Sequence, residues 1–100
     1  MVKHIVMIEL MEKAEGSFKS QNAEKIKKIL DELPSKISEI KQYEIGINFD
    51  KSDRAMDLVI LSAFEDKEAL GRYLAHPEHL KAVEFIDKLR QGSKVVDFEV

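Results

Sequence analysis

The segment YLAHPEHLKAVEFI, residues 73–86, holds two of the three histidines of the chain, three positions apart around a proline. Histidine changes charge near neutral pH, so it can act as a base, bind a metal or cap a helix. A zinc site on His76 and His79 would need further ligands, but Glu78 points elsewhere on the helix and the chain has no cysteine. We therefore expect no metal and no other cofactor. Acid–base chemistry and a structural role remain open.

The two histidines of this segment are predicted to play different parts. Pro77 suits the first turn of a helix, which favours His76 as the N-cap and gives it a structural role. The residues at helical spacing from His79 are apolar: Ala82, Val83 and Ile86. His79 is therefore expected to point inward, either as a reactive group or as a packed side chain bonded to the backbone.

The third histidine lies in the opening segment VKHIVMIEL, residues 2–10, which alternates like a strand. His4 shares one face with Val2, Val6, Ile8 and Leu10. The other face also carries apolar residues, Ile5 and Met7, so we expect this strand to be covered on both sides.

Six segments of the chain must position these side chains. We expect a helix from about residue 20 that breaks near Pro34, and a helical segment that stops at Gly92. The predicted order is strand 2–10, helix 20–33, strand 41–49, strand 56–64, broken helix 65–74 and 76–89, and strand 94–100. This order is typical of a ferredoxin-like α+β fold, a four-stranded antiparallel sheet with helices on one face.

The uncovered face of such a sheet needs a partner. A chain of 100 residues without cysteine has a small core and no disulfide to support it. The apolar residues of the outer face, such as Ile5 and Met7, are best covered by a second copy of the same sheet. We therefore expect a homodimeric α+β barrel.

Composition narrows the class of protein further. With 44% hydrophobic and 35% charged residues, the chain is expected to form one soluble domain over residues 1–100. No apolar run is long enough for a membrane span, no signal peptide is visible, and a cytoplasmic location is expected. The net charge of -3 argues against nucleic acid, and the basic run KIKK at 25–28 reads as a solvated helix face.

Three segments carry a resemblance to a known family: VKHIVMIEL at the start, AFEDKEALGRYLAHPEHLKAVEFI in the middle and VVDFEV at the end. Their most specific parts are VKHIV and YLAHPEH. The chain resembles the stress-responsive A/B barrel (Dabb) proteins, which are dimeric α+β barrels. The family includes polyketide cyclases that close a ring by aldol chemistry without a cofactor, and stress-associated proteins. The resemblance implies four pocket residues: His4, Tyr73, His79 and Asp97.

The chemistry of an aldol closure suggests a role for each of these residues. His79 would be the base, with Asp97 bonded to its other ring nitrogen to fix the tautomer, while Tyr73 and His4 would donate to a developing oxyanion. Two departures weaken a polyketide pocket: the first helix reads AEKIKKIL where the cyclases have aromatic residues, and Leu58 stands in place of a histidine.

The leading hypothesis is a small-molecule-binding Dabb protein. Its narrower form is a cofactor-free cyclase, lyase or isomerase that acts on a carbonyl compound. The alternative is a non-catalytic stress-responsive dimer whose polar residues are structural. A cofactor-free monooxygenase, a third hypothesis, rests on fold analogy alone. Whether the protein is an enzyme stays open at this point.

Overall fold

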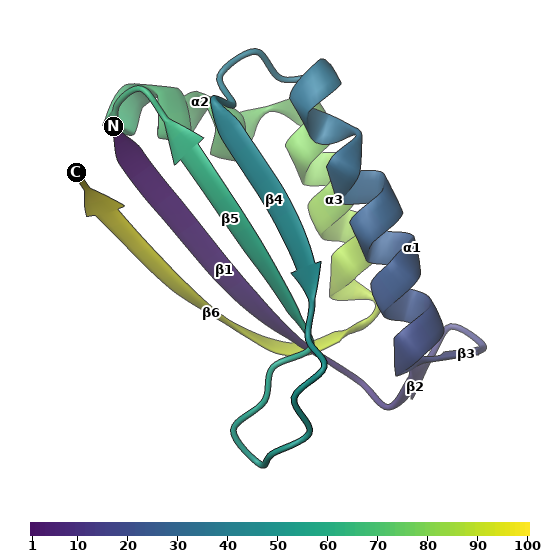
Figure 1. The fold of residues 1–100 in the computed structure, drawn as a ribbon. Coiled ribbons are helices and arrows are strands. Elements are labelled where there is room, and N and C mark those ends of the chain that lie inside the picture. The colour runs from purple at the N-terminus through teal and green to yellow at the C-terminus, as the bar shows by residue number, and fades with distance from the viewer.

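The computed structural model describes all 100 residues. Figure 1 shows a twisted sheet with the helices on one side of it. The elements are β1 (Val2–Leu10), β2 (Lys13–Ala14), β3 (Ser17–Phe18), α1 (Lys19–Asp31), the short 3₁₀ helix η1 (Leu33–Ser35), β4 (Gln42–Ile47), β5 (Leu58–Phe64), α2 (Lys67–Ala75), α3 (Pro77–Asp87) and β6 (Arg90–Glu99).

Four strands form one antiparallel sheet in the order β4-β5-β1-β6. The first and last strands of the chain are therefore neighbours, and the two termini lie at the same end of the sheet (Figure 1). The ferredoxin-like α+β fold predicted from the order of the segments is confirmed.

The core lies between the sheet and the helices. The alternation of β1 works as predicted, because Val2, His4, Ile8 and Leu10 are all buried on the helix side. From the helices, Ile26 and Leu30 of α1 and Ile86 of α3 meet them. None of the helices is long and apolar enough to cross a membrane.

Local sequence determines where the helices begin and end. The α1 helix ends at Asp31 and the chain continues as the 3₁₀ turn that contains Pro34, close to the predicted break. Asp66 caps α2 by accepting a hydrogen bond from the N–H of Ala69 at 2.8 Å. His76 caps α3, as predicted, because its Nδ1 accepts from the N–H of Glu78 at 3.1 Å.

The prediction that Gly92 stops the last helix is wrong. The helix ends earlier, at Asp87, and β6 already begins at Arg90. Glu9 pairs with Gly92 while Leu10 pairs with Arg90, so Gln91 is an extra residue in a β-bulge. The glycine belongs to this irregular start of the strand.

A small hairpin joins β1 to α1. The strands β2 and β3 are two residues each, too short for their alternation to be seen in the sequence. Glu15 and Gly16 between them have positive φ values of 50° and 79°, as in a type I′ turn.

Candidate functional site

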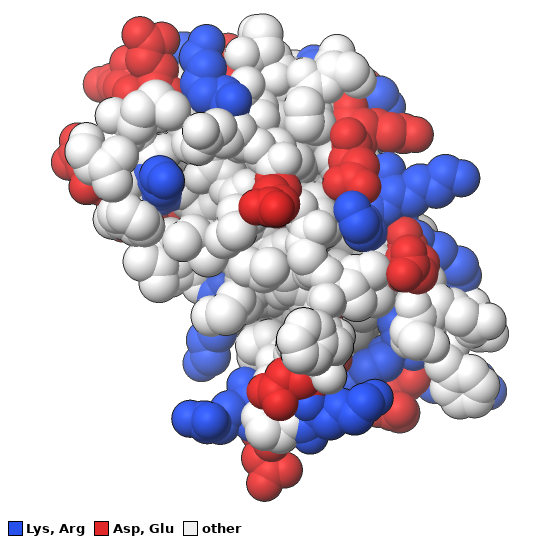
Figure 2. Space-filling view, viewed as in Figure 1, with Lys and Arg blue, Asp and Glu red and all other residues white.

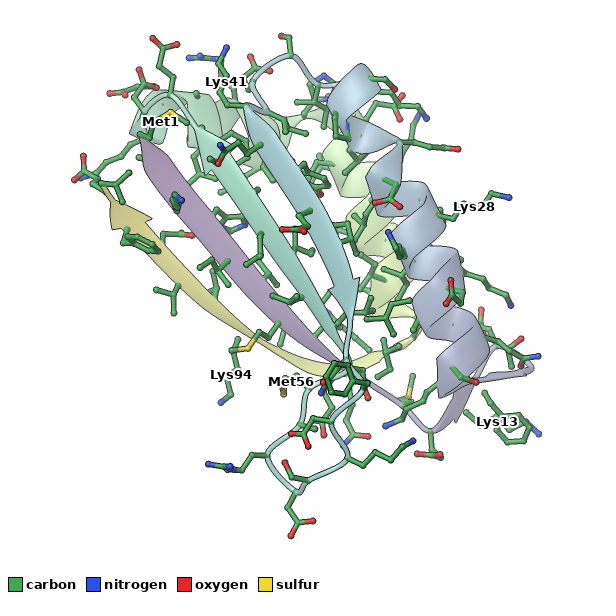
Figure 3. All side chains as sticks on the ribbon, viewed as in Figure 1. Met1, Lys13, Lys28, Lys41, Met56 and Lys94 are labelled. Atoms are coloured by element: carbon green, nitrogen blue, oxygen red, sulfur yellow. The ribbon has the colours of Figure 1, made fainter.

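A cavity of about 240 Å³ lies between the sheet and the helices α2 and α3. Figure 3 shows side chains in the space between the sheet and the helices. Most of its lining is aliphatic, and its ionisable lining residues are His4, Tyr73, His79 and Arg90. Three of the four residues implied by the resemblance therefore line one cavity.

The fourth residue, Asp97, reaches this cavity through His4. His4 on β1 lies directly opposite Asp97 on β6, so both side chains point to the helix side of the sheet. The Nδ1–H of His4 donates a hydrogen bond to Oδ1 of Asp97. The prediction that Asp97 orients His79 is wrong, because the register of the two strands gives Asp97 to His4.

A backbone carbonyl orients His79 instead. Its Nδ1 lies 3.0 Å from the carbonyl oxygen of Leu74, in the last turn of α2. This carbonyl is one of the acceptors that a helix leaves unpaired at its C-terminal end. Because a carbonyl oxygen can only accept, Nδ1 must carry the proton, and the neutral ring keeps its lone pair on Nε2.

The surroundings of His79 favour its neutral form. Burial lowers the pKa of His79 below the ordinary value of 6.5, and the hydrogen bond to Leu74 offsets part of this effect. The positive charges that His4 and His76 carry when protonated lower the pKa further. At neutral pH the ring is therefore an uncharged base in a mostly apolar cavity.

Tyr73 is buried between the sheet and α3. Its ring centroid lies 4.4 Å from that of His79 and 4.8 Å from that of Phe64. Its hydroxyl shares a hydrogen bond with the hydroxyl of Tyr43, with the two oxygens 3.0 Å apart. Burial raises the pKa of Tyr73, so this hydroxyl keeps its proton and remains available as a donor.

Tyr43, on β4, does not line the cavity but bonds the hydroxyl of Tyr73, which does, and sequence reasoning missed this contact. Burial also raises the pKa of Tyr43, and the neighbouring Tyr73 hydroxyl raises it further. One feature of the sequence pointed to it: Tyr43 shares a strand face with Ile45, which is buried, and a tyrosine on a core face needs a partner for its hydroxyl. The identity of that partner depends on the tertiary fold.

The expected departures from the cyclases are visible in the lining. Leu30 of α1 lines the cavity, so the first helix contributes an aliphatic side chain and no aromatic one. Ile60 of β5 is a further aliphatic lining residue. Leu58 is fully buried in the core. The side chains include no group of three His, Cys, Asp or Glu residues that could hold a metal ion.

A larger hollow of about 380 Å³ lies on the opposite side of the sheet, beside the loop between β4 and β5. Met7, Val59 and Phe49 line it, and no histidine or tyrosine does. It therefore lacks the acid–base groups of the cavity beside α3, which is the better candidate site.

Comparisons with known proteins support the family and the fold. The family model for the stress responsive A/B barrel domain matches residues 2–100. No curated protein sequence is significantly similar to the chain. Among solved structures, several with the same fold cover nearly the whole chain.

Three of these structures are of particular interest. A dimeric ferredoxin-like protein of unknown function from Bacteroides fragilis is 28% identical, with a TM-score of 0.86 over 99% of this chain and 95% of the other. One from Jannaschia sp., also described as dimeric, is 30% identical, with a TM-score of 0.74 over 99% and 98%. A hydroxynitrile lyase from Passiflora edulis is 16% identical, with a TM-score of 0.79 over 99% and 92%, and shares the fold.

Proposed function

Because the chain belongs to the stress responsive A/B barrel domain family, we propose that its cavity binds a small carbonyl compound and catalyses proton transfer on it without a cofactor. The observation that carries this proposal is His79, whose Nδ1 donates to the Leu74 carbonyl while its ring lines the cavity. A base that is neutral at pH 7 and fixed in one tautomer can accept a proton from a bound substrate.

The proposed first step uses each polar group once. The Nε2 lone pair of His79 takes a proton from the carbon beside the carbonyl. The electrons of the broken C–H bond form a C=C bond, and the π electrons of the carbonyl move to its oxygen. The resulting enolate needs donors in a dry site. The Tyr73 hydroxyl supplies one. His4 gives its Nδ1–H to Asp97, so it adds a second donor, Nε2–H, only when its ring is protonated.

Cyclases, lyases and isomerases that act on carbonyl compounds can share this proton removal. The site therefore supports the proton removal itself and does not single out one of these three reactions. One structural neighbour is a hydroxynitrile lyase, an enzyme with this fold that acts on a small molecule. The cavity of about 240 Å³ suits a small substrate, since drug-sized ligands occupy pockets of about 300–1,000 Å³.

The test is proton exchange with solvent. The wild-type protein, incubated in D₂O with a panel of methyl ketones and β-keto esters, is expected to speed deuterium incorporation beside the carbonyl, followed by proton NMR. His79→Gln should reduce this rate by about 100-fold or more, the usual contribution of a general base. His76→Asn is the matched control, because it removes a histidine and keeps a good N-cap.

Equal exchange rates for the wild type and His79→Gln would contradict the proposal. They would favour the competing hypothesis, a non-catalytic dimer in which His79 only packs against Tyr73 and contributes to stability.

The outer face of the sheet supports a further part of the proposal, a homodimer. Its partly exposed apolar residues are Met7, Leu61, Val96 and Phe98. Figure 2 shows that uncharged side chains cover most of the middle of the molecule in this view, with the charged ones mainly around the rim. Structural neighbours of 28% and 30% identity are described as dimeric. We propose that two copies pack these faces together, because exposed apolar patches mark protein interfaces.

Sedimentation checks the proposed dimer. Val96→Lys places a charge on the outer face and is expected to produce monomers at micromolar concentration. Leu80→Lys is the matched control, because Leu80 is similarly exposed, at 52% against 55%, but lies on α3. Dissociation by both variants, or by neither, would argue against the sheet face as the interface.

A further inference from the structure

The cavity beside α3 has a second polar end that takes no part in the proposed proton transfer. Arg90 and Ser93 of β6 line it, and Nη1 of Arg90 donates to Oγ of Ser93 at 3.3 Å. Arg90 also forms an ion pair with Asp87 at 2.6 Å, at the last residue of α3. The guanidinium is thereby held near the C-terminal end of this helix, while His79 lies in its first turn.

The β-bulge explains why two residues three positions apart line the same cavity. In a regular strand, residues 90 and 93 would point to opposite faces. Here Ser93 pairs with Ile8 and Arg90 pairs with Leu10, and both partners are buried on the helix side. The extra residue, Gln91, turns Arg90 toward the cavity, and such redirection of a side chain is a recognised use of bulges.

The charges around this end favour an anion. No carboxylate lines the cavity, and Arg90 is its only permanent cation. Lys94, the next basic residue of β6, points away from the sheet (Figure 3) and pairs with Met7 on the outer face. Asp87 uses part of the guanidinium, but its side chain is 51% exposed, so this pair is a weak solvent-screened one. A guanidinium has five N–H donors, which leaves some free for a ligand.

The two polar ends are separated by an apolar section. Asp87 lies eight residue steps along the helix from His79, about 12 Å at 1.5 Å per residue. The side chains along this stretch are aliphatic: Val6, Ile8, Ala82, Val83 and Ile86. From this arrangement, and resting on the proposed function, we infer that the substrate is a linear keto acid whose carbonyl meets His79 and Tyr73 and whose carboxylate meets Arg90 and Ser93.

The inference is tested with keto acids and their neutral esters. The probes are the ω-1 oxo acids from six to twelve carbons and the matching methyl esters, titrated into the full-length protein and followed through the side-chain NMR signals of His79. The acid of best length is expected to bind about tenfold or more tightly than its ester, the effect of a hydrogen bond to a charged group.

Variants assign this preference to one side chain. Arg90→Gln should weaken acid binding about tenfold and leave ester binding unchanged, and Arg90→Lys should restore part of the difference. Arg72→Gln is the matched control, since Arg72 is 62% exposed and pairs with Glu39 on the outer side of α2. If Arg90→Gln loses its folded spectrum, Arg90→Lys is measured in its place, because it keeps the charge.

Each outcome has a distinct meaning. Equal binding of acids and esters, or no effect of Arg90→Gln, overturns the keto acid inference and leaves the proposed proton transfer in place. If no acid in the series binds, the inference is also overturned, and the deuterium exchange experiment alone then decides the proposed function.

Discussion

Replacement of Tyr43 and Tyr73 by phenylalanine, singly and together, isolates the hydroxyl pair beside the cavity. The two oxygens lie 3.0 Å apart, and Tyr73 is 2% exposed. Each single variant removes one hydroxyl and leaves the other without its partner. The double variant removes both and keeps the two aromatic rings.

The magnitude follows from the cost of an unpaired buried polar group, about 1–3 kcal/mol. Each single variant is therefore expected to lose about 2 kcal/mol of unfolding free energy, which lowers Tm by roughly 8–16 °C in a domain of this size. The double variant should be at least as stable as either single variant, because two apolar groups of the same shape can replace a hydrogen-bonded pair at little cost.

Urea unfolding of the wild type and the three variants measures these differences. All four proteins are compared at one protein concentration, since a dimer that dissociates on unfolding makes stability depend on concentration. The coupling free energy between the two hydroxyls is the departure of the double variant from the sum of the single ones.

A double variant whose loss of stability equals the sum of the two single losses would refute this reasoning. It would mean that each hydroxyl finds another partner as soon as the first is removed, for example water that enters through the cavity. The two hydroxyls would then not depend on each other for a hydrogen-bond partner.

Three further predictions concern the histidines and one helix end. Asp97→Asn should change the ring-nitrogen NMR shifts of His4 and leave those of His79 unaltered, because only His4 contacts Asp97. The pKa of His79 is lower in the folded protein than 6.5, so between the folded pKa and pH 6.5 the folded state binds fewer protons than the unfolded one. The contribution of His79 to stability is therefore full above pH 6.5 and is lost as the pH falls through the folded pKa. His79→Gln should flatten this loss of stability in acid unfolding curves. Asp66→Ala should cost about 1 kcal/mol in thermal unfolding, because it removes the N-cap of α2.

Features of the fold that depend on neighbouring residues could be predicted from the sequence. Pro34 ends α1 within a few residues of the expected place, because its ring prevents a regular helix there whatever surrounds it. His76 caps α3 for a similar reason, since Pro77 fixes the start of the helix. The alternation in β1 identified the side of the sheet that His4 faces.

Features that depend on pairing between distant segments could not. Asp97 and His79 were both expected near the cavity, but the partner of Asp97 is decided by the register of β1 and β6. A shift of one residue would turn Asp97 to the other face, and β6 has apolar residues on both faces, so its own alternation does not fix that register. Gly92 shows the same limit, because α3 ends without a glycine and the bulge that contains Gly92 exists only once the two strands have paired.

The pairing of β1 with β6 also governs when the candidate site can form. His4 and Asp97 are 93 positions apart, and Val100 donates a backbone hydrogen bond to Met1 at 2.9 Å. Contacts between such distant residues form late in folding, because a long loop must close first. Until β6 docks, the growing chain has neither the His4–Asp97 pair nor Arg90 at the cavity. The site is therefore absent from any folding intermediate that lacks this strand.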